Sequence, residues 1–213
     1  MPRRSQVLLE PRKTPVQARS TASVNAILDA TIQVLLRVGK ERLTTTRVAL
    51  RAGVSVGTLY QYFPNKSALL QAALKRHLDD VTIGIELACK EQQGETLRQM
   101  ATALITSFFE TKMKNAKTSI ALYSVSSDLD GAKIVRQTGI HTNKAIVEML
   151  GSSREPLTKD PELVASVLQG AMAGIIRRLL ESGAPKKQFE ALQQELIVFA
   201  SAYLETCSVR PML

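Results

Sequence analysis

The sequence of 213 residues is poor in the side chains on which most enzymes and metal sites depend. It has two cysteines, two histidines and no tryptophan, and aromatic residues make up 4% of the chain. Cys89 and Cys207 are too few for a disulfide framework or a zinc site. No glycine-rich phosphate loop, metal-ligand spacing or nucleophile–base pair accompanies the histidines, His77 and His141. We therefore expect a cytoplasmic protein that is not an enzyme and holds no metal or cofactor.

Long apolar runs are also missing. No stretch approaches the roughly 20 apolar residues that a membrane-spanning helix requires. The N-terminus, Met1-Pro2-Arg3-Arg4, is basic, but no continuous apolar segment follows it, so a secretory signal is not expected. Apolar residues still make up 45% of the chain, enough to build a core in one or two compact units. The sequence thus predicts a folded protein with no membrane-spanning part.

Acidic residues are scarce in the first third of the chain. The whole chain has 28 Lys and Arg against 19 Asp and Glu, a formal charge of +9. Residues 1–77 hold 13 of the basic and three of the acidic residues, a net +10, and residues 78–213 hold 15 and 16, a net −1. This split favours a basic module that binds a polyanion, joined to a nearly neutral module with another task. A basic surface that serves solubility alone is the alternative that net charge leaves open.

Apolar residues recur at helical spacing through most of the chain. Residues 1–19, with three prolines and five basic residues, instead predict a flexible basic arm. The i, i+3, i+4 pattern predicts an all-α protein of about nine helices, and no alternating strand pattern is present. The predicted helices cover approximately 20–38, 44–52, 56–63, 65–89, 95–114, 118–126, 132–150, 162–182 and 185–203. Gly39 is expected to end the first helix in the left-handed conformation of a helix cap.

The segment from Thr44 to Tyr60 has the order helix, glycine turn, helix. Gly53 permits the positive φ of such a turn, and Ala49 is small where the two helices cross. The spacing suits a helix-turn-helix, whose second helix enters the major groove of DNA. The helix that begins at Lys66 adds a positive charge and free N–H groups, which favour a phosphate.

These residues resemble the DNA-binding domain of TetR-family transcriptional regulators. The resemblance covers about residues 20–70 and is carried by Gly39, Thr44–Thr46, Val48-Ala49, Ala52–Ser55, Gly57–Tyr60, Tyr62-Phe63 and Lys66. It implies an N-terminal three-helix helix-turn-helix domain over 20–66 and a C-terminal helical ligand-binding and dimerisation domain over 67–213. It also implies a homodimer that grips a palindromic operator on double-stranded DNA and releases it when a small molecule binds.

The resemblance implies DNA contacts position by position. The base-facing residues are Thr46, Ser55, Val56, Gly57, Thr58 and Gln61. The phosphate-contacting residues are Thr45, Tyr60, Tyr62 and Lys66. Val56 departs from the family, many members of which carry Lys or Arg there, and this argues against direct guanine reading at that position. The basic arm is longer than usual and can enter a neighbouring minor groove through Arg3, Arg4, Arg12 and Lys13.

The nearly neutral part of the chain carries weaker signals. Small residues in 162–182 allow close approach of helices, so the last two helices are candidates for a dimer interface. The interface candidates are Val167, Gly170, Ala171, Gly174, Ile175, Leu196 and Phe199. Apolar walls with one or two polar groups suit a small-molecule pocket, although ordinary core packing is the better account of any single residue. The pocket candidates are Met100, Leu104, Phe108, Tyr123, His141 and Met149.

Three classes of function follow from these patterns. The leading one is a ligand-responsive DNA-binding regulator, most often a repressor in the family that the chain resembles. The alternative is a DNA-binding adaptor without a small-molecule ligand, controlled by protein partners. An enzyme with a basic patch is a third class, which the shortage of catalytic groups disfavours.

Overall fold

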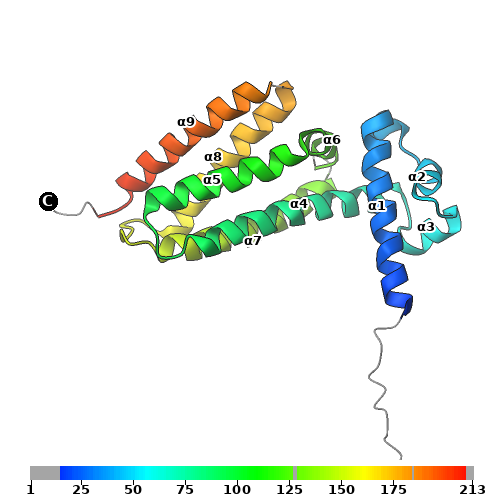
Figure 1. Cartoon of the computed structure of the whole chain (residues 1–213), viewed down its shortest axis with the longest axis horizontal. Coiled ribbons are helices and arrows are strands. Elements are labelled where there is room, and N and C mark those ends of the chain that lie inside the picture. The colour runs from blue at the N-terminus through cyan, green and yellow to red at the C-terminus, as the bar shows by residue number, and fades with distance from the viewer. Residues whose placement is uncertain (1–14, 127–128, 184, 210–213) are drawn as a thin grey trace, which may run out of the picture. The chain divides into compact units, whose positions relative to one another are not determined.

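The computed structural model describes residues 15–126, 129–183 and 185–209 of the chain. Within these ranges the backbone forms nine α-helices and no strand beyond an isolated bridge between Leu157 and Ser208. The prediction of an all-α fold is therefore confirmed for the described residues (Figure 1). The helices are α1 (Pro15–Arg42), α2 (Thr45–Ala52), α3 (Val56–Tyr62), α4 (Lys66–Glu91), α5 (Leu97–Lys114), α6 (Ala116–Ser126), α7 (Leu129–Gly151), α8 (Pro161–Ser182) and α9 (Lys186–Thr206).

The chain divides into two compact units, Met1–Leu69 and Leu70–Leu213. The first contains α1, α2 and α3, and the second contains α5 to α9. The division falls inside α4, which begins in the first unit and continues into the second. One continuous helix therefore belongs to both units.

The N-terminal unit is organised around α2, which packs against both α1 and α3. Val48 of α2 and Leu59 of α3 are fully buried, as is Ile27 of α1. The side chain of Thr44 accepts a hydrogen bond from the first turn of α2, and Gly53 ends this helix with φ 69 in the left-handed region that favours glycine. Burial and capping together hold two helices that are too short to be stable alone.

The first helix begins earlier than the sequence predicts. It starts at Pro15 instead of near Ser20, so residues 15–19, expected to belong to a flexible arm, are helical. Proline suits the first turn because its φ is already helical and its missing N–H would have no partner there. The remainder of the predicted arm, with Arg3, Arg4, Arg12 and Lys13, lies outside the described residues.

Gly39 interrupts α1 close to its C-terminal end. Its φ of 75 is positive, as predicted, but its ψ of 169 is far from the left-handed helical value. The backbone becomes helical again over residues 40–42. The expected left-handed cap at Gly39 is therefore wrong in its detail, since the glycine forms a kink between two helical stretches.

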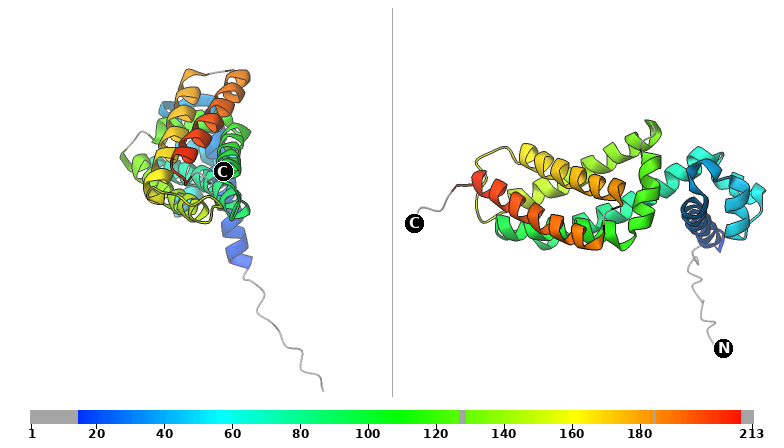
Figure 2. Two further views of the ribbon diagram at one scale, coloured as in Figure 1. Left: turned by 90° about the vertical axis from the view of Figure 1, so that its left-hand side faces the viewer. Right: turned by 90° about the horizontal axis from the view of Figure 1, so that it is seen from above.

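The C-terminal unit is a bundle formed by α5 to α9 and the greater part of α4 (Figure 2). α5 packs extensively along α9, and α7 along α8. Met100, Phe109, Ile146 and Leu204 are representative of the large core cluster that these helices share. Two of these helices have N-terminal side-chain caps: Thr96 and Gln99 form a reciprocal capping box at the start of α5, and Asp160 caps α8.

The α8 helix is an exception to the expected lack of long apolar segments. By length and composition alone, it is the one helix in the described ranges that could cross a membrane. Its Val164, Leu168 and Met172 are buried in the core of the C-terminal unit, and 39% of its apolar window is buried. A core helix of a bundle passes the same test of length and composition, so this finding is weak evidence for a membrane segment.

Helices α4 and α5 approach each other closely at Gly84. The hydroxyl of Ser107 donates a hydrogen bond to the Gly84 carbonyl oxygen at 2.8 Å. A Cβ atom at position 84 would lie 2.8 Å from Thr111 Oγ1, which itself donates to the Ser107 carbonyl oxygen. Glycine at this position therefore permits the close contact, because any larger residue must displace Thr111.

We expect Gly84→Ala to destabilise the protein by about 1–2 kcal/mol, because overpacking exceeds the gain in helix propensity. The matched control is Gly139→Ala in α7, where a Cβ atom would meet only Gln169 Oε1 at 3.9 Å, an ordinary contact. This control should be neutral or more stable by up to about 1 kcal/mol. Urea denaturation of both variants measures the two values, and equal stability would contradict the role of Gly84.

Candidate functional site

The turn between α2 and α3 is held by the first residues of α3. Ser55 is the N-cap, and its Oγ accepts a hydrogen bond from the Thr58 backbone N–H at 3.0 Å. The two hydroxyl oxygens of Ser55 and Thr58 lie 2.8 Å apart. Leu59 faces the core on the opposite side of the helix. The short α3 helix is thus fixed through its buried face and its cap, which leaves its other face at the surface.

The predicted base-facing residues lie mainly on this free surface. Four of them are exposed, Val56 is 36% exposed, and Thr58 is half-buried. The four exposed residues are Thr46, Ser55, Gly57 and Gln61. The side chains are small or uncharged, so DNA base edges could approach the helix backbone closely.

Gly57 is not required by packing inside the domain. A Cβ atom at this position would meet only Ser55 Oγ, at an ordinary distance of 3.7 Å, and the φ of Gly57 is not positive. Glycine inside a helix costs stability relative to alanine. Gly57 lowers helix stability and is not required by packing inside the domain. Its presence therefore points to a requirement outside the fold, such as the close approach of another molecule.

The predicted phosphate contacts fall into two groups. Thr45 Oγ1 and the Tyr60 hydroxyl are 3.1 Å apart, so the structure brings these two residues together at the start of α2. Lys66 lies elsewhere, with its Nζ donating to the Glu41 carbonyl oxygen at 3.4 Å. Tyr62 is half-buried. Each of the four carries a hydroxyl or an ammonium group, the kinds of group that bind phosphate oxygens in protein–DNA complexes.

Sequence reasoning did not single out the basic side chains of α2. Arg47 and Arg51 are both exposed, and the Arg47 guanidinium donates to the Arg42 carbonyl oxygen at 2.7 Å. Their i, i+4 spacing, on the side of α2 away from Val48 and Ala49, was the signal that could have found them. Leu50, which lies between them, is 82% exposed. The two arginines add positive charge beside the predicted DNA-facing surface.

The predicted pocket residues lie in different surroundings. Met100, Leu104, Phe108 and Met149 are buried in the core cluster. Tyr123 is half-buried, with the Arg177 guanidinium 5.2 Å from its ring centroid, and His141 is exposed. The sequence could not separate a pocket from a core, because both use the same apolar residues.

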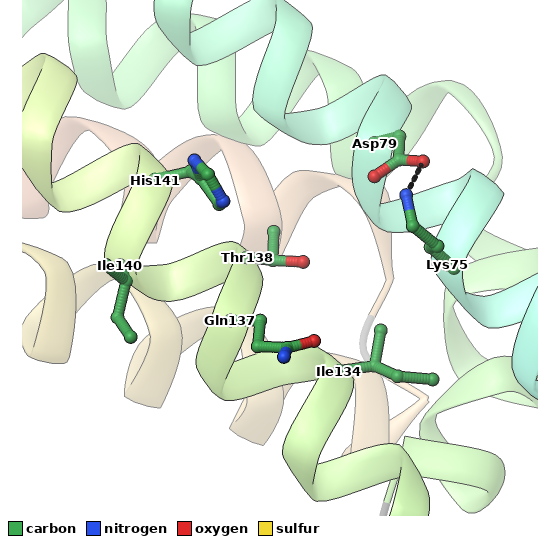
Figure 3. Close-up of a pocket in the computed structure, with 7 residues that line it drawn as sticks. All are labelled: Lys75, Asp79, Ile134, Gln137, Thr138, Ile140 and His141. Carbon is green, nitrogen blue, oxygen red and sulfur yellow. Dashed lines mark hydrogen bonds and ion pairs between the residues drawn. The ribbon is translucent and has the colours of Figure 1, made fainter.

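His141 instead lines an open pocket of about 380 Å³ on the C-terminal unit. Figure 3 shows this pocket, with Lys75 and Asp79 of α4 on one side and a row of α7 side chains on the other. The α7 residues are Ile134, Gln137, Thr138, Ile140 and His141. Lys75 and Asp79 form an ion pair of 2.6 Å, but both side chains are well exposed, so the pair contributes little stability.

The last two helices expose apolar side chains. Of the predicted interface residues, Val167, Gly170, Gly174 and Phe199 are exposed, and Ala171 and Ile175 are half-buried. Leu196 is only 2% exposed and packs in the core of its own unit. Leu163 and Val198, which were not predicted, are more than half exposed. An apolar surface therefore covers part of α8 and α9.

Comparison with known proteins assigns both units. The family model described as bacterial regulatory proteins, tetR family, matches residues 27–73. The model described as tetracyclin repressor-like, C-terminal domain, matches residues 96–204, which is more than half of the chain. The chain belongs to the TetR family. Members of this family are DNA-binding transcriptional regulators with a helix-turn-helix, and the protein is accordingly a transcriptional regulator.

Individual relatives agree with this assignment. The chain is 33% identical over 124 residues to the HTH-type transcriptional regulator BetI 1 of Chromohalobacter salexigens, a match that spans 55% of this chain and 60% of that relative. It is 25% identical over 165 residues to BetI of Escherichia coli, spanning 75% and 83% of the two chains. It is 27% identical over 161 residues to the nucleoid occlusion factor SlmA of Klebsiella pneumoniae, spanning 72% and 81%.

Solved structures share the TetR fold at lower identity. FadR of Bacillus subtilis, in complex with stearoyl-CoA, aligns with a TM-score of 0.68 and 19% identity, covering 83% of this chain and 97% of that one. A transcriptional regulator of Rhodococcus sp. Rha1 aligns with a TM-score of 0.67 and 20% identity, covering 89% and 100%. At this identity the likeness shows the fold alone.

A polar cluster lies inside the C-terminal unit of this TetR-family protein. His77 of α4 is buried, and its Nε2 lies 3.1 Å from the hydroxyl of Ser119 in α6, which is also buried. Burial, and then the positive charge of Lys112, lower the pKa of His77 to about 4. Burial lowers the pKa of Lys112 to about 8. His77 is therefore neutral at physiological pH, and sequence reasoning did not predict this cluster.

Cys89 is buried in the core cluster of the C-terminal unit. Burial, together with the negative charge of Glu86, raises the pKa of its thiol to about 12. The thiolate is the reactive form of cysteine, so burial disfavours the reactive form of Cys89.

The neutral His77 makes stability depend on pH. Above about pH 6.5 the histidine is neutral in both the folded and the unfolded chain, so it has no effect. As the pH falls from about 6.5 to about 4, the unfolded chain binds a proton that the folded chain does not, and the free energy of unfolding falls by roughly 3 kcal/mol. Urea denaturation across this pH range should show that the free energy of unfolding depends less steeply on pH in His77→Gln than in the wild type.

The control for this experiment is His141→Gln, which removes an exposed histidine in place of the buried one. If the free energy of unfolding depended on pH as steeply in His77→Gln as in the wild type, the buried, neutral state of His77 would be contradicted.

Proposed function

We propose that this TetR-family regulator is a cytoplasmic repressor that binds a palindromic operator as a homodimer. In this proposal residues 20–66 form the DNA-binding domain, and residues 67–213 form the ligand-binding and dimerisation domain. A small-molecule effector binds the second domain and releases the DNA. The observation that carries the proposal is the free surface of α3, where a helix fixed by Leu59 and the Ser55 cap presents small residues to the solvent.

The base-reading part of the proposal rests on Gly57 and its neighbours. An α3 without large side chains at positions 55 to 58 can lie deep in the major groove, where Thr58 and Gln61 reach base edges. Thr46 adds a short hydroxyl side chain from the first turn of α2. Specificity then comes from hydrogen bonds and close backbone approach, because no arginine or lysine is present on α3 to read guanine.

The phosphate-binding part rests on groups at both sides of this surface. The paired hydroxyls of Thr45 and Tyr60 form one anchor, and Lys66 at the start of α4 forms another. The backbone N–H groups and the dipole at the start of a helix favour a phosphate beside Lys66. Arg47 and Arg51 increase the positive charge of the same domain. These groups position the domain without reading sequence.

The exposed apolar surface of α8 and α9 supports a homodimer. Val167, Gly170 and Gly174 of α8 leave room for the close approach of a second helix pair, and Phe199 supplies a large apolar side chain. A two-fold axis would place two copies of α3 about 34 Å apart, which is the spacing of successive major grooves on one side of DNA. A palindromic operator follows from that symmetry.

The release by an effector follows from linkage between two binding events. A ligand that favours an arrangement unsuited to the operator lowers DNA affinity by its difference in affinity for the two arrangements. The solved structure of FadR from Bacillus subtilis contains stearoyl-CoA, so the same fold binds a small molecule in that protein. α4 is the natural route of coupling, because this single helix belongs to both units.

The similarity to SlmA supports a DNA-binding adaptor as the alternative function, because that relative is named a nucleoid occlusion factor and not a transcriptional regulator. A DNA-binding adaptor would respond to a protein partner and to no small molecule. Thermal unfolding with a panel of metabolites distinguishes the two, because a ligand of the folded state raises the melting temperature. A panel without any effect on melting or on DNA release would favour the adaptor.

The Gly57→Ala variant separates DNA contact from folding. We expect its free energy of unfolding to equal that of the wild type or to exceed it by up to about 1 kcal/mol. Alanine is the better helix former, and its Cβ atom meets no close neighbour at this position. Its affinity for the operator should nevertheless fall at least about tenfold, since the added methyl group prevents close approach to the base edges. Fluorescence anisotropy on a fragment selected from the native genome measures the affinity.

Lys66→Ala is the contrasting variant in the same assay. It should weaken binding to all DNA sequences alike and decrease the salt dependence of the affinity by about one unit or less. If Gly57→Ala left the operator affinity unchanged, α3 would not be the helix that contacts the base edges.

Phe199→Asp tests the dimer. A charge in the centre of an apolar interface is costly, so this variant should be a folded monomer with lowered operator affinity, as measured by light scattering and anisotropy. The control is Ile83→Asp in α4, because Ile83 is 61% exposed and Phe199 is 51% exposed. A Phe199→Asp protein that remains dimeric, or an equal effect of both variants, would place the interface elsewhere.

A further inference from the structure

The open pocket of about 380 Å³ lies between α4 and α7 of the C-terminal unit (Figure 3). Within the described ranges, α7 packs extensively along α8 and also against α6, and it lacks comparable packing against α4. None of the described residues that line the pocket belongs to the core cluster. The volume is near the lower end of the range for small-molecule sites. A small molecule can therefore occupy this space without disturbing the core.

The α7 side of the pocket presents three polar side chains, Gln137, Thr138 and His141. Among the residues that the structure describes, these side chains form no hydrogen bond with the protein. A threonine inside a helix commonly donates to the carbonyl oxygen four residues earlier, as Thr82 and Thr142 do at 3.0 Å and 3.2 Å. The hydroxyl of Thr138 instead points toward the α4 side of the pocket (Figure 3). Three hydrogen-bonding groups are thus available to a bound molecule.

The α4 side of the pocket carries two opposite charges that compensate each other. Lys75 Nζ and Asp79 Oδ2 are 2.6 Å apart. An ammonium group has three N–H donors and a carboxylate has two acceptor oxygens, so the pair retains donors and acceptors for a ligand. The described α7 residues of the pocket add no further Lys, Arg, Asp or Glu. With histidine counted as neutral, the formal charge of the lining residues is therefore zero.

We propose that this pocket binds a small neutral sugar or polyol, and that this molecule is the effector of the regulator. The inference rests on the proposed function, in which a small molecule controls DNA binding. Each hydroxyl group both donates and accepts hydrogen bonds. Two adjacent hydroxyl groups can therefore bridge the ion pair, one donating to Asp79 and the other accepting from Lys75. Further hydroxyl groups match the polar side chains of α7, and Ile134 offers an apolar surface to the C–H groups.

The same ion pair disfavours charged ligands. An organic anion could bind Lys75 only beside the Asp79 carboxylate, and an organic cation could bind Asp79 only beside the Lys75 ammonium group. In either case, repulsion from one member of the pair offsets much of the attraction to the other. A neutral molecule avoids this repulsion. Charge therefore separates the proposed class of ligand from acids and amines of the same size.

The position of the pocket couples the ligand to α4. Lys75 lies about 14 Å along the helix axis from Lys66 at the N-terminus of α4. In the other direction, Gly84 brings α4 into close contact with α5. A ligand that bridges α4 and α7 adds a second attachment, closer to Lys66. It therefore favours one placement of the helix that carries the proposed phosphate contact.

The experiment uses the full chain and six probes. Four are neutral, namely glucose, ribose, inositol and glucitol, and the other two, gluconate and N-methylglucamine, are anionic and cationic counterparts of glucitol. Thermal unfolding and release of a selected operator fragment are measured at about pH 7. A dissociation constant on the order of 1 mM is expected for so small a ligand, so each probe is titrated to roughly ten times that concentration.

Two variants test the two sides of the pocket. Thr138→Val removes one hydroxyl and keeps the branched shape of the side chain, and Asp79→Asn removes the negative charge. The control for the first is Thr102→Val, at an exposed threonine of α5. The control for the second is Glu148→Gln, in the exposed i, i+4 ion pair that Lys144 and Glu148 form elsewhere on α7.

We expect at least one neutral probe to raise the melting temperature and release DNA in the wild type and in both controls. Gluconate and N-methylglucamine should bind the wild type at least about tenfold more weakly. Thr138→Val should lower the affinity for the neutral probe about three- to tenfold, through loss of one hydrogen bond. Asp79→Asn should also lower it, but gluconate should bind this variant more tightly than the wild type, because Lys75 then lacks a neighbouring carboxylate.

The inference is overturned if no neutral probe affects the wild type, or if Thr138→Val and Asp79→Asn leave the effect unchanged. Equal affinity for glucitol and either charged counterpart would overturn the neutral class of ligand. A neutral probe that raises the melting temperature without releasing DNA would overturn its role as effector.

A wider metabolite panel separates this inference from the proposed function. If only a molecule outside the sugars and polyols releases DNA, the ligand-responsive function stands and the inference fails. If no molecule of the panel raises the melting temperature or releases DNA, the proposed function fails as well.

Discussion

The short helix α3 depends for its stability on the burial of a single face. α3 has seven residues and α2 has eight, and isolated helices of this length do not persist in water. Val48 and Leu59 bury their side chains fully, and the Ser55 and Thr44 caps satisfy the free backbone groups. Because the stability of α3 comes from one face and from the caps, its opposite face is not needed for packing. The surface proposed to meet DNA is therefore free to vary without loss of the fold.

The two units divide the physical tasks. The N-terminal unit is small and basic, and its short helices leave groups at the surface that can bind a polyanion. The C-terminal unit is larger and nearly neutral, and many of its apolar residues are buried in a shared core. Phe199 is an exception, because this large apolar side chain is 51% exposed. The proposed dimer would bury it.

Sequence reasoning succeeded where the physical signal is local. Glycine at position 53, a capping serine two residues later and apolar spacing on either side are sufficient to predict the helix-turn-helix. The start of α1 was misplaced because Pro15 can begin a helix or belong to an arm, and only the fold decides between them. Gly39 has the positive φ that glycine permits, but its ψ depends on how the next turn packs.

The buried contact between α4 and α6 could not be predicted in the same way. His77 and Ser119 are 42 residues apart in the chain, and their contact exists only because α4 and α6 meet. Met100, Leu104, Phe108 and Met149 have a composition typical of both a pocket and a core, and the structure places them in the core. A sequence records which residues are apolar, but the volume left between them depends on the packing of distant helices.

The exposed surface of α8 and α9 has a consequence for regulation in a cell. In the proposed dimer, the affinity for an operator depends on association of two chains, so the abundance of the regulator becomes an input beside the effector. At low expression the monomer predominates and occupancy grows with the square of the chain concentration. A promoter controlled in this way would switch over a narrower range of regulator levels than one bound by a single chain, and dilution at cell division would shift its set point.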